Sequence, residues 1–318
     1  MSPAWAARVA LINFRYHIVS LMAVFLALSV GIVLGVSLRG PVDEGLAQQA
    51  EQDRQQVTQL RADLDQQSAL DDYRDAWAER TGKELNQNLL AQRRVAIVVM
   101  PDAPADTVND LSAAVSDAGG VLTHIVRVNS DVFDPTKVGL VTRALAAYDQ
   151  ELEVSDATSN GARFGLALGR AVFDQQAVER DATAADLTQQ MTRSGLISIS
   201  GRSTEQAELA IVVTARAAEP ALAPEVLTDH VEMDVALKQH AVGVVLAGPN
   251  SEQIDGTDVL AARNTSAAAE TVSTVDVADL SSGVATTVMA GKEQLLGRSG
   301  HYGALSKADS PLPQLPVR

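Results

Sequence analysis

An uncharged apolar run near the N-terminus constrains this chain more than any other feature. Residues 18–38 form 21 consecutive positions without a charged residue or a proline. A helix of about 20 residues spans roughly 30 Å, the thickness of the hydrocarbon core of a bilayer. A segment inside that core must satisfy its own backbone hydrogen bonds, and a helix does so. The run therefore predicts a transmembrane helix over residues 17–38.

The charges on either side of this run predict its orientation. Arg8 and Arg15 precede it, no acidic residue occurs before it, and Asp43 and Glu44 follow soon after it. Because positive charge stays on the cytoplasmic side, we expect residues 1–16 inside the cell and the rest of the chain outside. The apolar core of a cleaved signal peptide is about 7–15 residues long. We therefore favour an uncleaved signal anchor over a cleaved signal.

Charge and cysteine content limit the functions open to the part that follows the run. Two of the 25 basic residues precede the run, so this part has 23 basic and 40 acidic residues, a net charge of −17. This part is not expected to bind nucleic acid, because binding phosphates requires clustered lysine and arginine. For the same reason it is not expected to bind anionic lipid. The chain has no cysteine, so its core and not disulfides must stabilise the exported part.

Two features predict that copies of the chain pair as a homodimer. Gly31 and Gly35 form a Gly-x-x-x-Gly pair, which permits close helix–helix approach in a membrane, although glycine also occurs in single spans. Residues 39–92 show apolar positions at alternating spacings of three and four, typical of a short polar coiled coil. These positions are Leu46, Ala50, Val57, Leu60 and Leu64. The alternative is a lone solvated helix that spaces the next domain from the membrane, and Gly82 is expected to break or kink either one.

From residue 93 onward the pattern changes to β-branched apolar runs that alternate with helical periods. This alternation predicts an extracytoplasmic α/β domain over residues 93–292, with a mostly parallel sheet flanked by helices. Strands are expected at residues 95–100, 121–128, 196–200, 209–214, 241–246 and 271–275. Helices are expected at residues 104–118, 135–148, 184–193, 223–239, 258–263 and 280–290.

Two further stretches have a distinctive composition. Gly161, Gly165 and Gly169 recur every four residues, so they line one face of a helix and predict tight packing against a neighbouring element. Residues 293–318 contain three prolines near their end, and we expect them to form an extended, disordered Pro-rich tail.

The sequence offers few candidates for chemistry. It contains no Gly-x-Ser-x-Gly, His-Glu-x-x-His or phosphate-loop motif, so neither catalysis nor a bound cofactor is expected. His230 and Met233 share a helix face, and imidazole with thioether suits copper, although a methionine at such a place is more often part of the core. In an open parallel sheet, ligands bind beyond the carboxyl ends of the strands. Asp102 and Asn250 follow predicted strands, where they either bind a polar ligand or form ordinary turns.

The string Phe14-Arg15-Tyr16-His17-Ile18-Val19-Ser20-Leu21, followed by the glycine-containing run up to Gly35, resembles the actinobacterial copper transporter family, MctB. The resemblance implies a role in copper homeostasis and a channel in the cell envelope, with copper as the metal concerned. It also implies an alternative known for corynebacterial relatives, a dimeric coiled-coil scaffold that regulates cell-wall hydrolysis at division with envelope or division proteins as partners. A sensor domain for a small ligand is the third possibility. The chain has no Cys-x-x-Cys and no repeated methionine and histidine, so its residues alone favour the scaffold or the sensor.

Overall fold

A computed structural model of the chain describes residues 4–37, 39–137, 139–176, 179–201, 203–251 and 255–314, and among these the side chains of residues 4–15 and 39–47 fall outside the description. The chain divides into two compact units, Met1–Asp71 and Asp72–Arg318. Helix α1 (Ala4–Ser37) lies in the first unit, and helix α2 (Arg39–Asn86) begins there and ends in the second.

The first unit contains the predicted apolar helix. Within the described residues, the segment Tyr16–Ser37 of α1 is 22 residues long and is the one helix that is long and apolar enough to cross a membrane. In the following part of α2, the side chains of Val57, Leu60 and Leu64 are 47%, 56% and 63% exposed. The side chain of Leu46 lies outside the described residues. The coiled-coil pairing through these positions stays a prediction.

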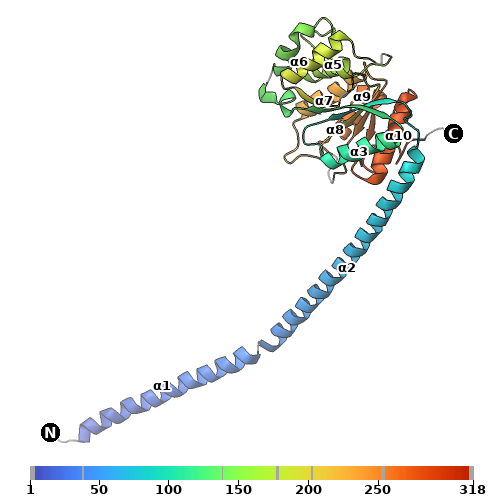
Figure 1. Ribbon diagram of the computed structural model, residues 1–318. Helices are drawn as coiled ribbons and strands as arrows, with labels where there is room; N and C mark the ends of the chain where they lie inside the picture. The colour runs from blue at the N-terminus through green and yellow to red at the C-terminus, as the bar shows by residue number, and fades with distance from the viewer. Residues whose placement is uncertain are drawn as a thin grey trace. The chain divides into compact units, whose positions relative to one another are not determined.

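The second unit is built on a mostly parallel, seven-stranded sheet (Figure 1), as the sequence predicts. The strand order is β3-β2-β1-β4-β5-β6-β7, and only the β2–β3 pair is antiparallel among the described residues. The strands are β1 (Arg94–Val99), β2 (Val121–Val128), β3 (Ile197–Ser200), β4 (Leu209–Val213), β5 (Gly243–Ala247), β6 (Ser273–Val275) and β7 (His301–Tyr302). The central strands β4 and β5 are buried along their whole length, because helices cover both faces of a parallel sheet.

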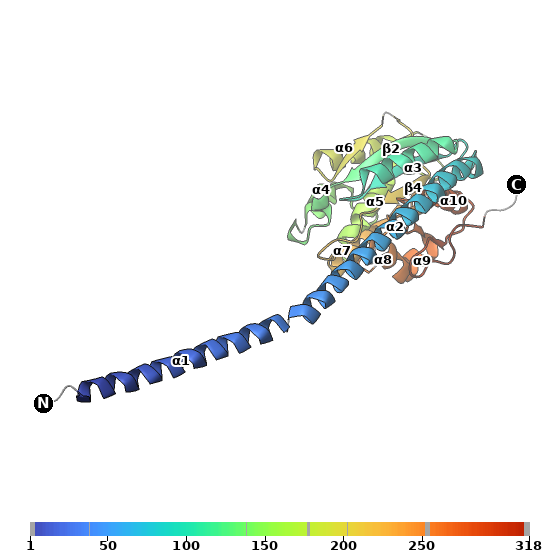
Figure 2. The same ribbon diagram turned by 90° about the horizontal axis from the view of Figure 1, so that it is seen from below.

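Helices cover the two faces of this sheet in separate groups (Figures 1 and 2). They are α3 (Ala105–Asp117), α4 (Leu140–Leu145), α5 (Asn160–Val172), α6 (Ala182–Arg193), α7 (Pro224–Leu237), α8 (Asp258–Asn264), α9 (Ser266–Thr271) and α10 (Ser281–Leu295), with short turns η1 (Ser130–Val132), η2 (Pro135–Lys137) and η3 (Ala146–Tyr148). Alternate residues of β1 pack on opposite faces. Val95 and Ile97 join the core under α3 and α10, whereas Ala96 and Val98 join the core under α5, α6 and α7.

The glycine face of α5 packs against α7, the close neighbour that the spacing predicts. A Cβ atom at Gly165 would lie 2.5 Å from the carbonyl oxygen of Met233 and 2.8 Å from the Cβ of Ala236. At Gly169 it would lie 2.7 Å from Cδ2 of His240. The missing side chains therefore allow the backbones of α5 and α7 to approach each other more closely than side chains would permit.

Two expectations about helices are wrong. Helix α2 continues through Gly82 to Asn86, because this glycine permits close packing on α10: a Cβ at Gly82 would lie 2.8 Å from the Cβ of Ala285. The helix expected over residues 135–148 is divided into η2, α4 and η3. Gly139 has a left-handed φ of 80°, which a continuous right-handed helix does not contain.

The expected disordered tail over residues 293–318 is also wrong for the residues that the structure describes. Helix α10 continues to Leu295, and the two residues His301–Tyr302 form β7 beside β6. The Asp309 carboxylate accepts a hydrogen bond from the His301 N–H at 2.9 Å. A two-residue strand between glycines has no hydrophobic period, so periodicity does not reveal it. Residues 315–318 lie outside the described residues.

Candidate functional site

A hollow of the α/β unit lies where the strand order reverses. The chain passes from β1 to β2 on one side of β1, and β4 later pairs with the other side. In open α/β sheets, ligands bind outside the carboxyl ends of the strands at such a point. A cavity of about 490 Å³ occupies this place, and we call it the switch-point pocket. Its lining is Met100, Pro101, Asp102, Pro104, Ser130, Phe133, Asp134, Pro135, Ala215, Arg216, Ala217, Ala218, Leu222, Val226, His230 and Asp258.

A buried histidine and a buried carboxylate form the polar part of this pocket. His230 on α7 and Asp258 at the start of α8 are 6% and 5% exposed, and Nδ1 of His230 lies 2.7 Å from Oδ1 of Asp258. Asp258 is held there because the Thr257 side chain caps α8 by accepting the Leu260 N–H. The ring of Phe133 meets the imidazole edge to face, with centroids 4.3 Å apart. Both contacts fix the orientation of the imidazole.

This contact also sets the hydrogen-bonding character of the histidine. A carboxylate only accepts hydrogen bonds, so Nδ1 of His230 is the donor to Asp258. In the neutral imidazole, Nε2 then carries a lone pair, and it makes no hydrogen bond to any residue that the structure describes. In this neutral form, a side chain that lines the pocket and is almost completely buried carries an acceptor without a protein partner among the described residues.

A second carboxyl group lies behind this pair. Asp234, one helical turn after His230, is 1% exposed, and its Oδ1 has no hydrogen-bond partner among the described residues. Burial raises the pKa of Asp234 well above its usual value, and the negative charge of Asp258 raises it further. Burial thus favours the protonated form of the Asp234 carboxyl group.

Charged groups at the rim of the pocket are mostly acidic. Asp102 follows β1 with a φ of 60° and is exposed. Hydrogen bonds from Thr136 lower the pKa of Asp134, so that its carboxyl group is ionised. Arg216, the basic group of the lining, is already paired with Asp279 at 2.6 Å. The rim thus presents two carboxylates, while its guanidinium already has an acidic partner.

The structure separates the predicted site residues. Asp102 and His230 line the switch-point pocket. Met233 is fully buried in the core on the side of α5, and its backbone lies against Gly165. Asn250 belongs to the loop after β5, where its N–H donates to Asp279 at 2.6 Å and its carbonyl oxygen accepts a hydrogen bond from Arg216.

The copper role of His230 with Met233 and the ligand role of Asp102 with Asn250 stay predictions, and so does pairing through Gly31 and Gly35. No group of three His, Cys, Asp or Glu side chains in the described part of the chain is arranged to hold a metal ion.

Phe133 and Asp258, which contact His230 in the pocket, are not among the residues that the sequence predicts for a site. Phe133 follows a strand end that the sequence did predict, so the rule that ligands bind at strand ends was the available signal. Asp258 is 28 positions from His230, and no local pattern connects them. Only the packing of α8 against α7 brings the two side chains together.

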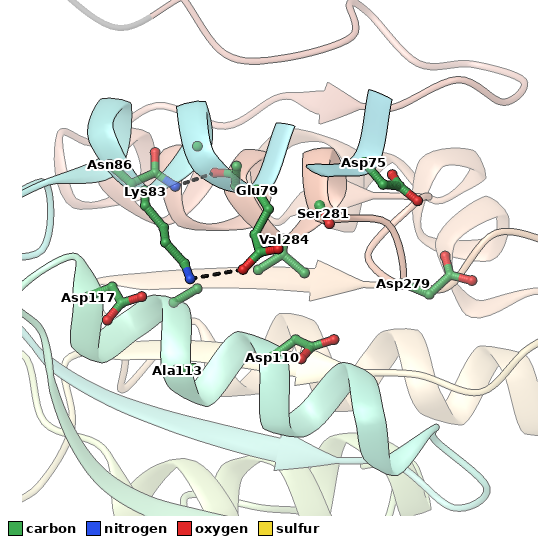
Figure 3. Close-up of a pocket in the computed structure, with 13 residues that line it drawn as sticks. Asp75, Glu79, Lys83, Asn86, Asp110, Ala113, Asp117, Asp279, Ser281 and Val284 are labelled. Carbon is green, nitrogen blue, oxygen red and sulfur yellow. Dashed lines mark hydrogen bonds and ion pairs between the residues drawn. The ribbon is translucent and has the colours of Figure 1, made fainter. Parts of the chain in front are cut away.

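A second hollow of about 350 Å³ lies between the last turns of α2 and helices α3 and α10 (Figure 3). We call it the acidic groove, because five of its lining residues are carboxylates: Asp75, Glu79, Asp110, Asp117 and Asp279. Lys83 extends into it and donates to Glu79 at 2.9 Å. The hydrogen bond to Glu79 raises the pKa of Lys83, so the lysine stays charged. The groove is a solvated acidic surface, with one ion pair at its centre.

Comparison with known proteins gives a consistent result over nearly the whole chain. The family model described as copper transport outer membrane protein, MctB, matches residues 11–313. Curated relatives named copper transporter MctB are 26% identical over 309 residues in Mycobacterium tuberculosis strain H37Rv and in Mycobacterium bovis, covering 92% of this chain and 96% of theirs. The relative from Mycobacterium leprae is 28% identical over 311 residues, with the same coverage. The match includes both the apolar helix and the α/β unit, and the chain therefore belongs to the MctB family.

Proposed function

We propose that this protein is a membrane-anchored, non-catalytic component of copper homeostasis in the cell envelope. The observation that carries the proposal is the family match over residues 11–313. Its curated relatives carry the name copper transporter, and the alignment with them covers 92% of this chain. The proposal extends that role to this chain, with copper as the cargo and not as a resident cofactor.

The anchor in this proposal is the segment Tyr16–Ser37, with the N-terminus in the cytoplasm and the α/β unit outside. The segment is 22 residues long, enough for a helix to cross the hydrocarbon core. Arg8 and Arg15 before it and the acidic residues after it support this orientation. In this arrangement the acidic groove and the switch-point pocket both face the space outside the membrane.

Pairing of copies is part of the proposal, because a single helix does not enclose a pathway for an ion. The Gly31 and Gly35 face would bring two spans together. The exposed Val57, Leu60 and Leu64 would continue the contact in α2. A dimer also places two acidic grooves on one assembly, and their carboxylates would concentrate copper ions at the α/β units by electrostatic attraction.

A cysteine introduced at Leu60 tests pairing and orientation together, because the natural chain has no cysteine. We expect the Leu60→Cys variant to form a disulfide-linked dimer on mild oxidation in membranes. We also expect a membrane-impermeant maleimide to label it in intact cells. The control is Gln59→Cys, which lies off the predicted heptad seam and should be labelled equally but cross-linked much less. A monomeric Leu60→Cys variant contradicts the paired stalk, and labelling only after permeabilisation contradicts the orientation.

Deletion of the gene in the native host tests the copper role itself. We expect cell-associated copper to change at a fixed external copper concentration, zinc to stay constant, and the full chain to restore the parental value. Unchanged copper together with altered cell-wall hydrolysis would contradict the copper role and favour the division scaffold.

A further inference from the structure

We propose that the switch-point pocket binds a small organic cation with an apolar body and a protonated amine. The site goes beyond the copper role, and its failure would leave that role untouched. Three features of the pocket favour such a ligand: its size and apolar lining, the acceptor at its buried end, and the charges at its rim.

The lining of the pocket favours an organic molecule with an apolar body. Its volume of about 490 Å³ lies within the roughly 300–1,000 Å³ that is usual for small-molecule sites. Most of its lining side chains are apolar, and Met100, Phe133, Leu222 and Val226 come from four different segments around it. Burying apolar ligand surface against such walls is the main source of affinity in sites of this kind.

The buried end of the pocket favours a ligand that donates hydrogen bonds. The bond from Nδ1 to Asp258 and the ring of Phe133 hold the imidazole of His230 in place, and Nε2 of the neutral imidazole is an acceptor. His230 is 6% exposed and lines the pocket. An ammonium group has three donors and no acceptor, which matches this lone pair.

The rim favours a positive ligand over a negative one. Asp102 and Asp134 contribute two carboxylates, whereas Arg216 already makes an ion pair with Asp279. An anion would meet these two carboxylates at the entrance, and a cation would be attracted to them. A bare metal ion fits less well, because no three His, Cys, Asp or Glu side chains converge in the described part of the chain.

Titration calorimetry on the full chain in lipid nanodiscs, with three probes of one size and shape, tests this assignment. The probes are phenethylammonium, phenylacetate and 2-phenylethanol, which are cationic, anionic and neutral at pH 7. We expect phenethylammonium to bind, 2-phenylethanol to bind more weakly and phenylacetate not to bind. Empty nanodiscs measure the partition of each probe into lipid.

Two variants locate the binding. His230→Asn keeps a donor for Asp258 and removes the acceptor at Nε2, so we expect it to weaken binding of phenethylammonium by roughly tenfold or more, the usual effect of a hydrogen bond to a charged group. Ala217→Trp fills the pocket from its surface loop and should abolish binding. Ala147→Trp, at an exposed position on η3 outside the lining, is the matched control and should bind like the natural chain. Absence of phenethylammonium binding, equal binding of phenylacetate, or binding that Ala217→Trp leaves intact would each overturn the proposal.

Discussion

The Gly161→Ala variant is expected to lose about 3 kcal/mol of the free energy of unfolding of the α/β unit, the upper end of the usual penalty for overpacking. A Cβ atom at Gly161 would lie 2.5 Å from the carbonyl carbon of Asp229 and 2.6 Å from its Cα. Both atoms belong to the backbone of α7, so no side-chain rotation relieves the overlap. Alanine is favoured over glycine in a helix by only about 1 kcal/mol, which is too little to compensate.

The same substitution at Gly169 provides the matched control, because it lies on the same face of α5. There the added Cβ would meet the imidazole of His240, with Cδ2 at 2.7 Å. A side chain can move aside, so we expect a clearly smaller loss of stability. Urea unfolding of the full chain in detergent, followed by circular dichroism, measures both variants. Equal transition midpoints for Gly161→Ala and the natural chain would contradict the close packing of α5 on α7.

The second large effect is expected at the buried ion pair between α8 and the end of β6. The Arg263 and Asp276 side chains are 0% and 2% exposed and lie 2.8 Å apart. Asp276 also accepts the Ala304 N–H at 2.8 Å, while Arg263 donates to the carbonyl oxygen of Tyr302 at 2.9 Å. This network holds β7 and the loop after it against β6. The Asp276→Ala variant should lose about 3–5 kcal/mol, because it leaves a guanidinium buried without its partner.

A variant without either charge separates the effect of the unpaired guanidinium from that of the lost ion pair. The Arg263→Met and Asp276→Leu double variant removes both charges, and we expect it to be more stable than Asp276→Ala, since a buried pair is often replaced by apolar residues at little loss. Limited proteolysis should also cut the chain after α10 faster in Asp276→Ala than in the natural protein. Equal stability of Asp276→Ala and the natural chain would show that the ion pair does not hold β7 in place.

Some parts of this fold follow directly from local sequence, and others do not. The predicted strands at 95–100 and 209–214 are runs rich in β-branched residues, and the structure has β1 and β4 there. The spacing of Gly161, Gly165 and Gly169 predicts a close neighbour, but nothing local identifies α7 as that neighbour. Gly82 illustrates the limit of a single-residue rule, since the tertiary contact with Ala285 outweighs the low helix propensity of glycine.

In the candidate site, too, local sequence predicts some features and tertiary contacts determine others. Strand-end reasoning located Asp102 at the pocket, because the carboxyl ends of parallel strands meet at one edge of a sheet. Helical spacing places His230 and Met233 on one face of a helix. In the structure, however, α7 contacts several elements, namely α5, α8, α9 and β5. His230 consequently lines the pocket, whereas Met233 lies in the core. The partner of His230 is Asp258 on another helix, and this contact depends on tertiary structure alone.

The copper content of host cells that carry defined versions of this chain tests the central claim most directly. Cells without the chain are complemented with the full protein, with a version whose Tyr16–Ser37 segment is replaced by an unrelated apolar helix, or with a secreted version that lacks the anchor. We expect the full protein to restore cell-associated copper to the parental value, the secreted version not to do so, and zinc to stay unchanged throughout. Copper that stays the same in every strain, with or without the chain, would contradict a role in copper homeostasis.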